Sequence, residues 1–420
     1  MNDSRRYVSL AVIAFTLALA YGVWYSYSVI MVALLREFGW SRSLLAGSFS
    51  LFTIVQGIAN PLIGSLCDRV RPERLVAAGS VALTLALCAD SFISSPWQLY
   101  LFFGLFTALA VAASGWVPAL VQVQRRFADR VGLGVGIASA GVGIGMTLVV
   151  PLCQLLIDAF GWRTAYRVHA LGCIAFILPS ALYLIRTAPS RSAAPPAPAA
   201  TMPPEATLRV ATHSMTPAQA MRTAPFWFVM GAFFLGNMCS QTLHVHQVAY
   251  LVDHGVAAIV AASVVGTVGL SSVICKIGSG WLSDRIEREL VYVGGIAIMV
   301  ASVAVLTIAG AVLSQSVAYL YAIMLGAGYS VTAAITPLMA SDRFSGRHYG
   351  TIVGFGLLSA SIGSALGPWL GGFLFDVTGS YGVPFTIAAS CGVLAAGAGW
   401  TARTLRVRAS AGFAQRGVSR

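Results

Sequence analysis

Gly64-Ser65-Leu66-Cys67-Asp68-Arg69 and Gly280-Trp281-Leu282-Ser283-Asp284-Arg285 share the pattern G-x-L-x-D-R within one chain of 420 residues. Each copy follows the second long apolar stretch of its half of the chain. A repeat at this position predicts two related halves. The glycine permits close helix approach, and an Asp-Arg pair at a helix end can cap backbone groups. We therefore expect Asp68, Arg69, Asp284 and Arg285 to latch the two halves together in one conformation.

The composition places these halves in a lipid bilayer. Hydrophobic side chains make up 57% of the chain and charged ones only 10%, whereas about a quarter of the positions in a soluble protein are charged. The apolar runs are continuous, which excludes an outer-membrane barrel with its alternating segments. A spanning helix takes roughly 20 to 25 residues. The sequence therefore predicts an all-α membrane protein with about twelve spans, at 7–35, 43–66, 75–92, 97–124, 131–158, 164–186, 224–252, 257–282, 290–313, 316–341, 347–374 and 381–404.

The positive charge follows this predicted topology. The net charge is +12, and most of the arginines lie at one set of span ends and in the tail. Only Arg36, Arg42, Arg163 and Arg167 lie at the opposite ends. Because cytoplasmic loops collect positive charge, both termini are expected in the cytoplasm of a bacterial cell, with the spans in its inner membrane. The charge then reports topology, and we expect no nucleic-acid partner.

A Pro- and Ala-rich segment divides the spans six and six. The predicted organisation is an N-terminal bundle at 1–186, a cytoplasmic linker at 187–222, a C-terminal bundle at 223–405 and a basic tail at 406–420. A looser echo pairs the glycine-rich fifth span with the eleventh, which we interpret as helix-packing faces. The seven cysteines lie scattered in apolar stretches, which indicates neither disulfides nor a metal site. No phosphate-binding loop or nucleophile-base set occurs, so the sequence predicts no ATP, no cofactor and no enzyme.

These features resemble the major facilitator superfamily. The paired G-x-L-x-D-R turns, the six-plus-six layout and the central linker carry the resemblance, which covers essentially the whole chain. It implies two pseudo-symmetric six-helix bundles that work by alternating access as a monomeric unit in the bilayer.

Shorter motifs resemble the bacterial branch of monocarboxylate transporters and oxalate/formate exchangers. They are Tyr25-Ser26-Tyr27-Ser28, Glu37-Phe38-Gly39-Trp40-Ser41, the stretch from His246 to Asp253, and Gly379-Ser380-Tyr381. The resemblance implies a small organic anion as substrate, a monocarboxylate. It also implies a carboxylate-binding cation at Lys276, where the family usually has arginine, a substrate-contacting histidine at His246 and a hydroxyl donor at Tyr329.

Lys276 is a candidate from the residues alone. It is the only lysine in the chain and lies inside an apolar span, where a charge costs at least about 2.5 to 3.5 kcal/mol. No acidic residue lies at the centre of any predicted span, so a substrate anion is the natural counter-ion. The alternative is that its side chain reaches the cytoplasmic interface and binds nothing.

The remaining candidates would complete a small-anion site. His246 can orient a carboxylate or carry a proton. Its neighbour His244 lies about 200° round the helix, so only one of the two is expected to face the substrate. Tyr25 and Trp116 are further candidate substrate contacts.

The sequence is compatible with more than one driving force for transport. Proton-coupled relatives often carry an acid one helical turn before the cation, and Ser272 stands there instead. Proton symport through His246 or the substrate's own carboxylate therefore competes with anion exchange of the oxalate/formate type and with facilitated flux. A drug or amphipath exporter of the same superfamily, in which Lys276 would be incidental, is the other alternative.

Overall fold

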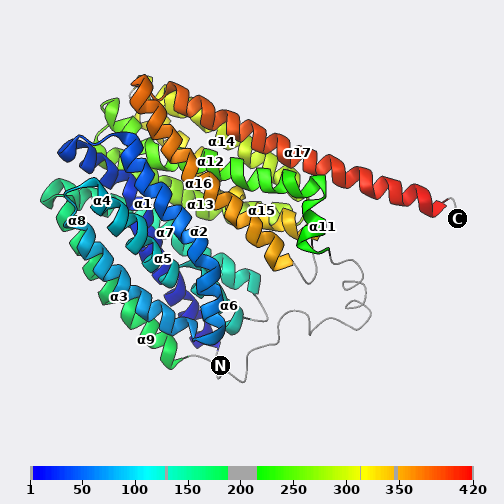
Figure 1. The fold of residues 1–420 in the computed structure, drawn as a ribbon, viewed down its shortest axis with the longest axis horizontal. Helices are drawn as coiled ribbons and strands as arrows, with labels where there is room; N and C mark the ends of the chain where they lie inside the picture. The colour runs from blue at the N-terminus through cyan, green and yellow to red at the C-terminus, as the bar shows by residue number, and fades with distance from the viewer. Residues whose placement is uncertain (1–2, 128–130, 188–214, 313, 345–348, 419–420) are drawn as a thin grey trace.

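The chain folds into two groups of helices, which Figure 1 shows converging at one end and separating toward the other. The computed structural model describes residues 3–127, 131–187, 215–312, 314–344 and 349–418, and within these it contains helices and no strand. The predicted all-α membrane fold is confirmed.

The helices of the N-terminal half are α1 (Asp3–Phe38), α2 (Arg42–Arg69), α3 (Pro72–Asp90), α4 (Pro96–Leu99), η1 (Tyr100–Thr107), α5 (Ala108–Ser114), α6 (Trp116–Arg126), α7 (Val131–Phe160), α8 (Trp162–Gly172), η2 (Cys173–Ile177) and α9 (Leu178–Arg186). Those of the C-terminal half are α11 (Pro217–Met221), α12 (Ala224–Asp253), α13 (Ala258–Ser283), α14 (Arg288–Val312), α15 (Gln315–Phe344), α16 (Tyr349–Thr378) and α17 (Gly382–Val418).

The membrane spans agree with the predicted ones to within several residues. In the part of the chain that the structure describes, 11 helical stretches are long and apolar enough to cross a membrane. The twelfth is α12, which is 30 residues long and carries polar side chains that lower its hydropathy. The fourth and sixth spans contain π-helical turns, η1 and η2. The predicted linker lies mostly outside the described residues, and α17 continues as a helix through Val418, well past the predicted end of its span.

The glycine-rich helices pack tightly within each half. In α7, Gly141 and Gly145 lie directly against the backbone carbonyls of Ala14 and Ala18 in α1, where a Cβ would clash. In α16, Gly363 and Gly367 lie in the same way against the carbonyls of Phe234 and Met238 in α12. The two pairs occupy equivalent places in the two halves, as the looser sequence echo suggested.

A single added methyl group tests this close approach. We expect Gly145→Ala to lower the free energy of unfolding by about 1 to 3 kcal/mol, because it overpacks the α1–α7 contact. Gly136→Ala on the same helix is the matched control, since its Cβ would meet nothing within 4 Å. It should be neutral or slightly stabilising, because alanine favours a helix. Thermal unfolding in detergent measures both variants, and equal stability of the two would contradict the packing argument.

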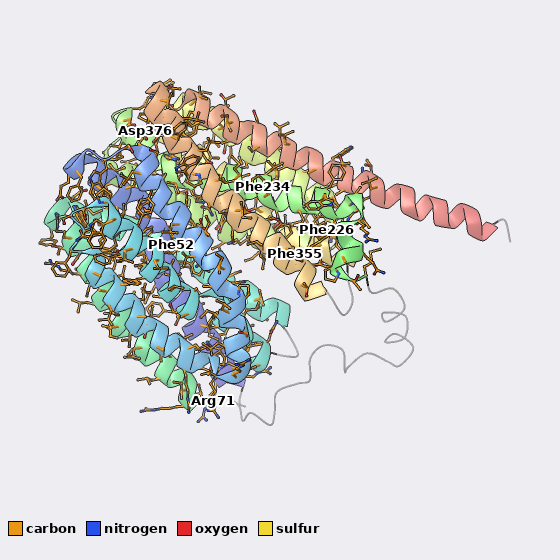
Figure 2. The ribbon with its side chains drawn as sticks, in the orientation of Figure 1. Phe52, Arg71, Phe226, Phe234, Phe355 and Asp376 are labelled. Atoms are coloured by element: carbon orange, nitrogen blue, oxygen red, sulfur yellow. The ribbon has the colours of Figure 1, made fainter. Side chains whose placement is uncertain are left out.

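The two halves meet mainly along α2 with α16 and α7 with α13, and α1 also packs against α12. At one end, which we term the closed end, the backbone N–H groups of Arg42 and Ser43 donate to Asp376 at 2.9 and 2.8 Å. Figure 2 shows Asp376 where the two groups of helices converge, and Arg71 and Phe226 at the opposite ends of their halves. We term that opposite side the arginine-rich end, because it carries Arg71 and the basic helix ends around it.

Each half carries one buried ion pair at the arginine-rich end. In the N-terminal half, Arg126 lies 2.9 Å from Glu73, and their side chains are 0% and 4% exposed. In the C-terminal half, Arg343 lies 3.1 Å from Glu289, with side chains 7% and 0% exposed. Both arginines also donate to a backbone carbonyl near the end of the half's last span. Each pair therefore joins three helices of its own half.

Candidate functional site

Lys276 extends its side chain toward the other helices rather than toward the helix end. It lies on α13 and is half-buried. Its Nζ is 5.0 Å from the centre of the Tyr329 ring, within range of a cation–π interaction. Tyr329 lies midway along α15. Among the described residues, no carboxylate lies within ion-pair distance of Lys276. The amine therefore lies over an aromatic ring with no protein anion beside it.

Tyr329 connects this amine to the N-terminal half. Its hydroxyl is 2.9 Å from the Tyr25 hydroxyl of α1, and either can donate. Both tyrosines are buried, with 8% and 7% of their surface exposed. The candidate site therefore spans the two halves, so relative motion of the halves would change the contacts of a ligand bound here.

His244, and not His246, lies in this group. Its ring centre is 5.5 Å from that of Tyr25 and 4.9 Å from that of Tyr329. Its Nδ1 is 2.8 Å from the Ser240 carbonyl. A carbonyl can only accept, so Nδ1 carries a proton, and in the neutral imidazole Nε2 presents a lone pair. That Nε2 is buried and has no hydrogen-bond partner among the described residues.

Two further polar atoms near this group are buried without a partner in the described part of the chain. They are Nε1 of Trp24 and Oε1 of Gln241. Trp24 stacks on Tyr25, with ring centres 6.0 Å apart and an interplanar angle of 18°. Gln241 lies one helical turn before His244 on the same face of α12. Buried polar groups are nearly always hydrogen-bonded, so these two unpaired atoms near Tyr25 are candidate ligand contacts.

Sequence reasoning missed Trp24 and Gln241. A signal for the α12 residues was present, because Asn237, Gln241 and His244 follow one another at spacings of four and three. That spacing places them on one helix face. Trp24 carries no comparable signal, since an indole in a membrane span is ordinarily a packing or interfacial residue.

The structure places Trp116 at the edge of this group. It is half-buried at the start of α6, directly after Gly115, which lies against the Tyr21 ring. Tyr21 stacks on Trp24 at 5.3 Å. Trp116 is therefore the chain neighbour of a residue that adjoins the stacked rings of Tyr21, Trp24 and Tyr25.

His246 lies in a separate cluster at the closed end. It is fully buried, and its Nε2 and Nδ1 are 2.8 Å from the Pro368 carbonyl and 3.2 Å from the Tyr381 hydroxyl. Both ring nitrogens are thus occupied by protein groups. The geometry brings Lys276, Tyr329 and Tyr25 together with His244, and keeps His246 apart from them.

The four residues of the repeated turns lie at the arginine-rich end. Arg69, Asp284 and Arg285 are exposed, and the Arg285 guanidinium stacks on Trp281 of its own helix, 3.5 Å from the ring centre. The side chain of Asp68 lies outside the described residues. The hydrogen bonds between halves described above lie at the closed end and at the Tyr25–Tyr329 pair.

The sequence matches a family model over most of its length. The model described as Major Facilitator Superfamily matches residues 13–355 and 265–418. The chain belongs to the major facilitator superfamily. Two solved structures of a bacterial homolog of the human lysosomal transporter Spinster, inward-facing and either unoccupied or occupied, share its fold, with TM-scores of 0.69 and 0.70. They are 15% and 16% identical, and the match covers 96% of this chain and 98% of each of theirs.

Curated relatives within the superfamily confirm the resemblance found in the motifs. The chain is 28% identical to rat (Rattus norvegicus) monocarboxylate transporter 13 over 403 residues, covering 92% of this chain and 85% of that protein. It is 29% identical to mouse (Mus musculus) monocarboxylate transporter 11 over 391 residues, covering 89% and 81%. The uncharacterised MFS-type transporter YcxA of Bacillus subtilis (strain 168) is 21% identical over 85% of both chains. This facilitator is a multi-pass membrane transporter related to monocarboxylate transporters, and not an enzyme.

Proposed function

We propose that the protein carries a small organic anion, a monocarboxylate, across the membrane by alternating access. The observation that carries this proposal is the Lys276 amine, which lies over Tyr329 with no carboxylate in ion-pair range among the described residues. A substrate carboxylate supplies the missing counter-ion.

The groups around the amine would orient the substrate. The Tyr25 and Tyr329 hydroxyls can donate to a carboxylate oxygen, and Trp24 offers a free indole N–H. His244 offers a lone pair, which accepts from a hydroxyl or a protonated acid group of the substrate. Because Tyr25 and His244 belong to different halves, substrate binding would favour the conformation that brings them together.

The same proposal assigns the two ends. The arginine-rich end would face the cytoplasm of the cell, by the charge distribution of the loops. The structure is then the form that is closed toward the outside. Asp68, Arg69, Asp284 and Arg285 would latch the cytoplasmic end when it closes, in the opposite conformation.

Anion exchange is the second candidate mechanism. Ser272 of α13 is buried and donates to the Gly269 carbonyl at 2.8 Å, so the position one turn before Lys276 holds a satisfied hydroxyl rather than an acid. A carrier without a protonatable partner beside its cation would exchange one anion for another or work by facilitated flux. Counterflow of the labelled substrate, compared at pH 5.5 and pH 7.5, separates the two mechanisms.

A ligand screen on the purified protein tests the substrate class. We expect small monocarboxylates to raise the melting temperature of the protein by a few degrees, because a ligand that binds only the native state stabilises it. Amphipathic cations of matched size serve as the control. Stabilisation by those cations and by none of the carboxylates would remove the anion proposal and favour the exporter.

A further inference from the structure

The closed end contains a second polar cluster that the Lys276 site does not use. The Arg42 guanidinium of α2 donates to Asp253 of α12 at 2.6 Å, with side chains 11% and 37% exposed. It also lies 3.9 Å from the centre of the Phe375 ring. Together with the two backbone donors to Asp376, these contacts hold α2 of one half against α12 and α16 of the other.

A chain of hydrogen bonds runs from Arg42 to His246. Arg42 Nη1 donates to the Tyr381 hydroxyl at 2.5 Å, which lies 3.2 Å from His246 Nδ1. His246 Nε2 lies 2.8 Å from the Pro368 carbonyl. A guanidinium can only donate and a carbonyl can only accept. His246 therefore carries a proton on Nε2, and in the neutral imidazole Nδ1 accepts from the Tyr381 hydroxyl.

We propose that His246 is a proton-binding site that opens the closed end. A proton added to Nδ1 would face the Tyr381 hydroxyl, which already accepts from Arg42. The hydroxyl would lose its acceptor, and an imidazolium would stand close to a guanidinium of like charge. Both effects weaken the contacts of Arg42 with Tyr381 and Asp253 of the C-terminal half.

The sign of the effect follows from linkage. The closed form disfavours protonated His246, so the open form binds the proton more tightly, and acid shifts the equilibrium toward opening. The proposal rests on the alternating-access function above. It assigns proton coupling to the gate rather than to substrate contact.

The other charged and titratable groups around His246 have fixed roles in this cluster. Arg42 of α2 reaches His246 through the Tyr381 hydroxyl, and Asp376 of α16 is engaged by two backbone donors. Asp253 is paired with Arg42. Burial raises the pKa of the Tyr381 hydroxyl, so it keeps the proton that it donates. On α12 itself, Tyr250 packs its ring against Tyr381, and His254 is bonded to the Tyr250 carbonyl.

The test measures the closed end directly. Cysteines introduced at the exposed positions Ser41 and Ser380, one in each half, carry spin labels in the full-length protein, and pulsed electron resonance reads their separation at pH 8 and pH 5. We expect the ratio of open to closed forms to rise about tenfold on acidification, which corresponds to one unit of pKa difference between the forms. His246→Gln should abolish this rise, because glutamine keeps a donor and an acceptor but does not titrate.

Two further variants keep the result interpretable. His254→Gln removes the other histidine at this end and should retain the wild-type response. Tyr381→Phe keeps the ring but breaks the hydrogen-bond chain, so it should open the gate at both pH values and flatten the response. A wild-type gate that ignores pH, or a His246→Gln gate that responds like wild type, overturns the proposal. The measurement needs no substrate, so its outcome is independent of whether carboxylates are carried.

Discussion

Replacing Lys276 by glutamine is expected to remove most of the affinity of the protein for carboxylates. The ammonium lies over the Tyr329 ring, and glutamine replaces it with an uncharged polar side chain. Removing one partner of a desolvated charge pair costs about 2 to 5 kcal/mol. Lys276 is only half-buried, so we expect the lower part of this range, a loss of roughly 30-fold or more in affinity. Isothermal titration of the purified variant with a carboxylate that binds the wild type measures the loss.

Lys276→Arg is the control for charge. Arginine keeps the positive charge and presents two parallel N–H donors for a bidentate contact, so binding should remain within about tenfold of wild type, or 1.4 kcal/mol. If Lys276→Gln binds carboxylates as tightly as wild type while both variants stay folded, the amine is not the docking point, and the superfamily assignment alone survives.

The fold and the position of Lys276 could be predicted from the sequence because both depend on local signals. Continuous apolar stretches locate the spans, and a lone lysine inside one of them stands out without any tertiary information. The contact between Lys276 and Tyr329 could not be derived in this way, since it depends on how α13 packs against α15. The resemblance to a known family supplied Tyr329 instead.

The choice between His244 and His246 shows the limit of motif matching. Both lie in the same stretch of the same helix, and a shift of two residues turns the side chain to a different neighbour. The matching motif favoured His246, whereas the spacing of Asn237, Gln241 and His244 favours the other face. His246 contacts Pro368 and Tyr381, which lie 122 and 135 residues further along the chain. No local sequence pattern predicts these contacts.

The sequence also contains a signal for the glutamates of the two buried ion pairs. Glu73 follows Gly64 by nine residues, and Glu289 follows Gly280 by the same number. Each glutamate therefore belongs to the same repeat as the G-x-L-x-D-R turns. Its arginine partner lies near the end of the next span, at Arg126 or Arg343, so the two halves share an internal brace as well as a surface turn.

Removing the carboxylate of Glu73 tests this brace. Glu73→Gln leaves the Arg126 guanidinium buried without its counter-charge, which typically costs about 3 to 5 kcal/mol. We expect a large fall in the melting temperature of the protein, since the unpaired Arg126 stays buried and is also bonded to the Leu184 carbonyl, at a point where three helices meet. Thermal unfolding in detergent, followed by circular dichroism, gives the measurement.

The exposed pair of Glu37 and Arg163 provides the matched control, because its N–O distance of 2.5 Å is shorter than the 2.9 Å of the Arg126–Glu73 pair, whereas both of its side chains are 39% exposed. Surface pairs contribute about 0 to 1 kcal/mol, so Glu37→Gln should lower the melting temperature far less than Glu73→Gln does.

The double variant Glu73→Gln with Arg126→Met removes both charges, and it should recover much of the lost stability, since two neutral side chains leave no unpaired charge inside the bundle. If the double variant is no more stable than Glu73→Gln alone, the hydrogen bond of Arg126 to the Leu184 carbonyl matters more for stability than its ion pair with Glu73. The ion-pair explanation would then be wrong.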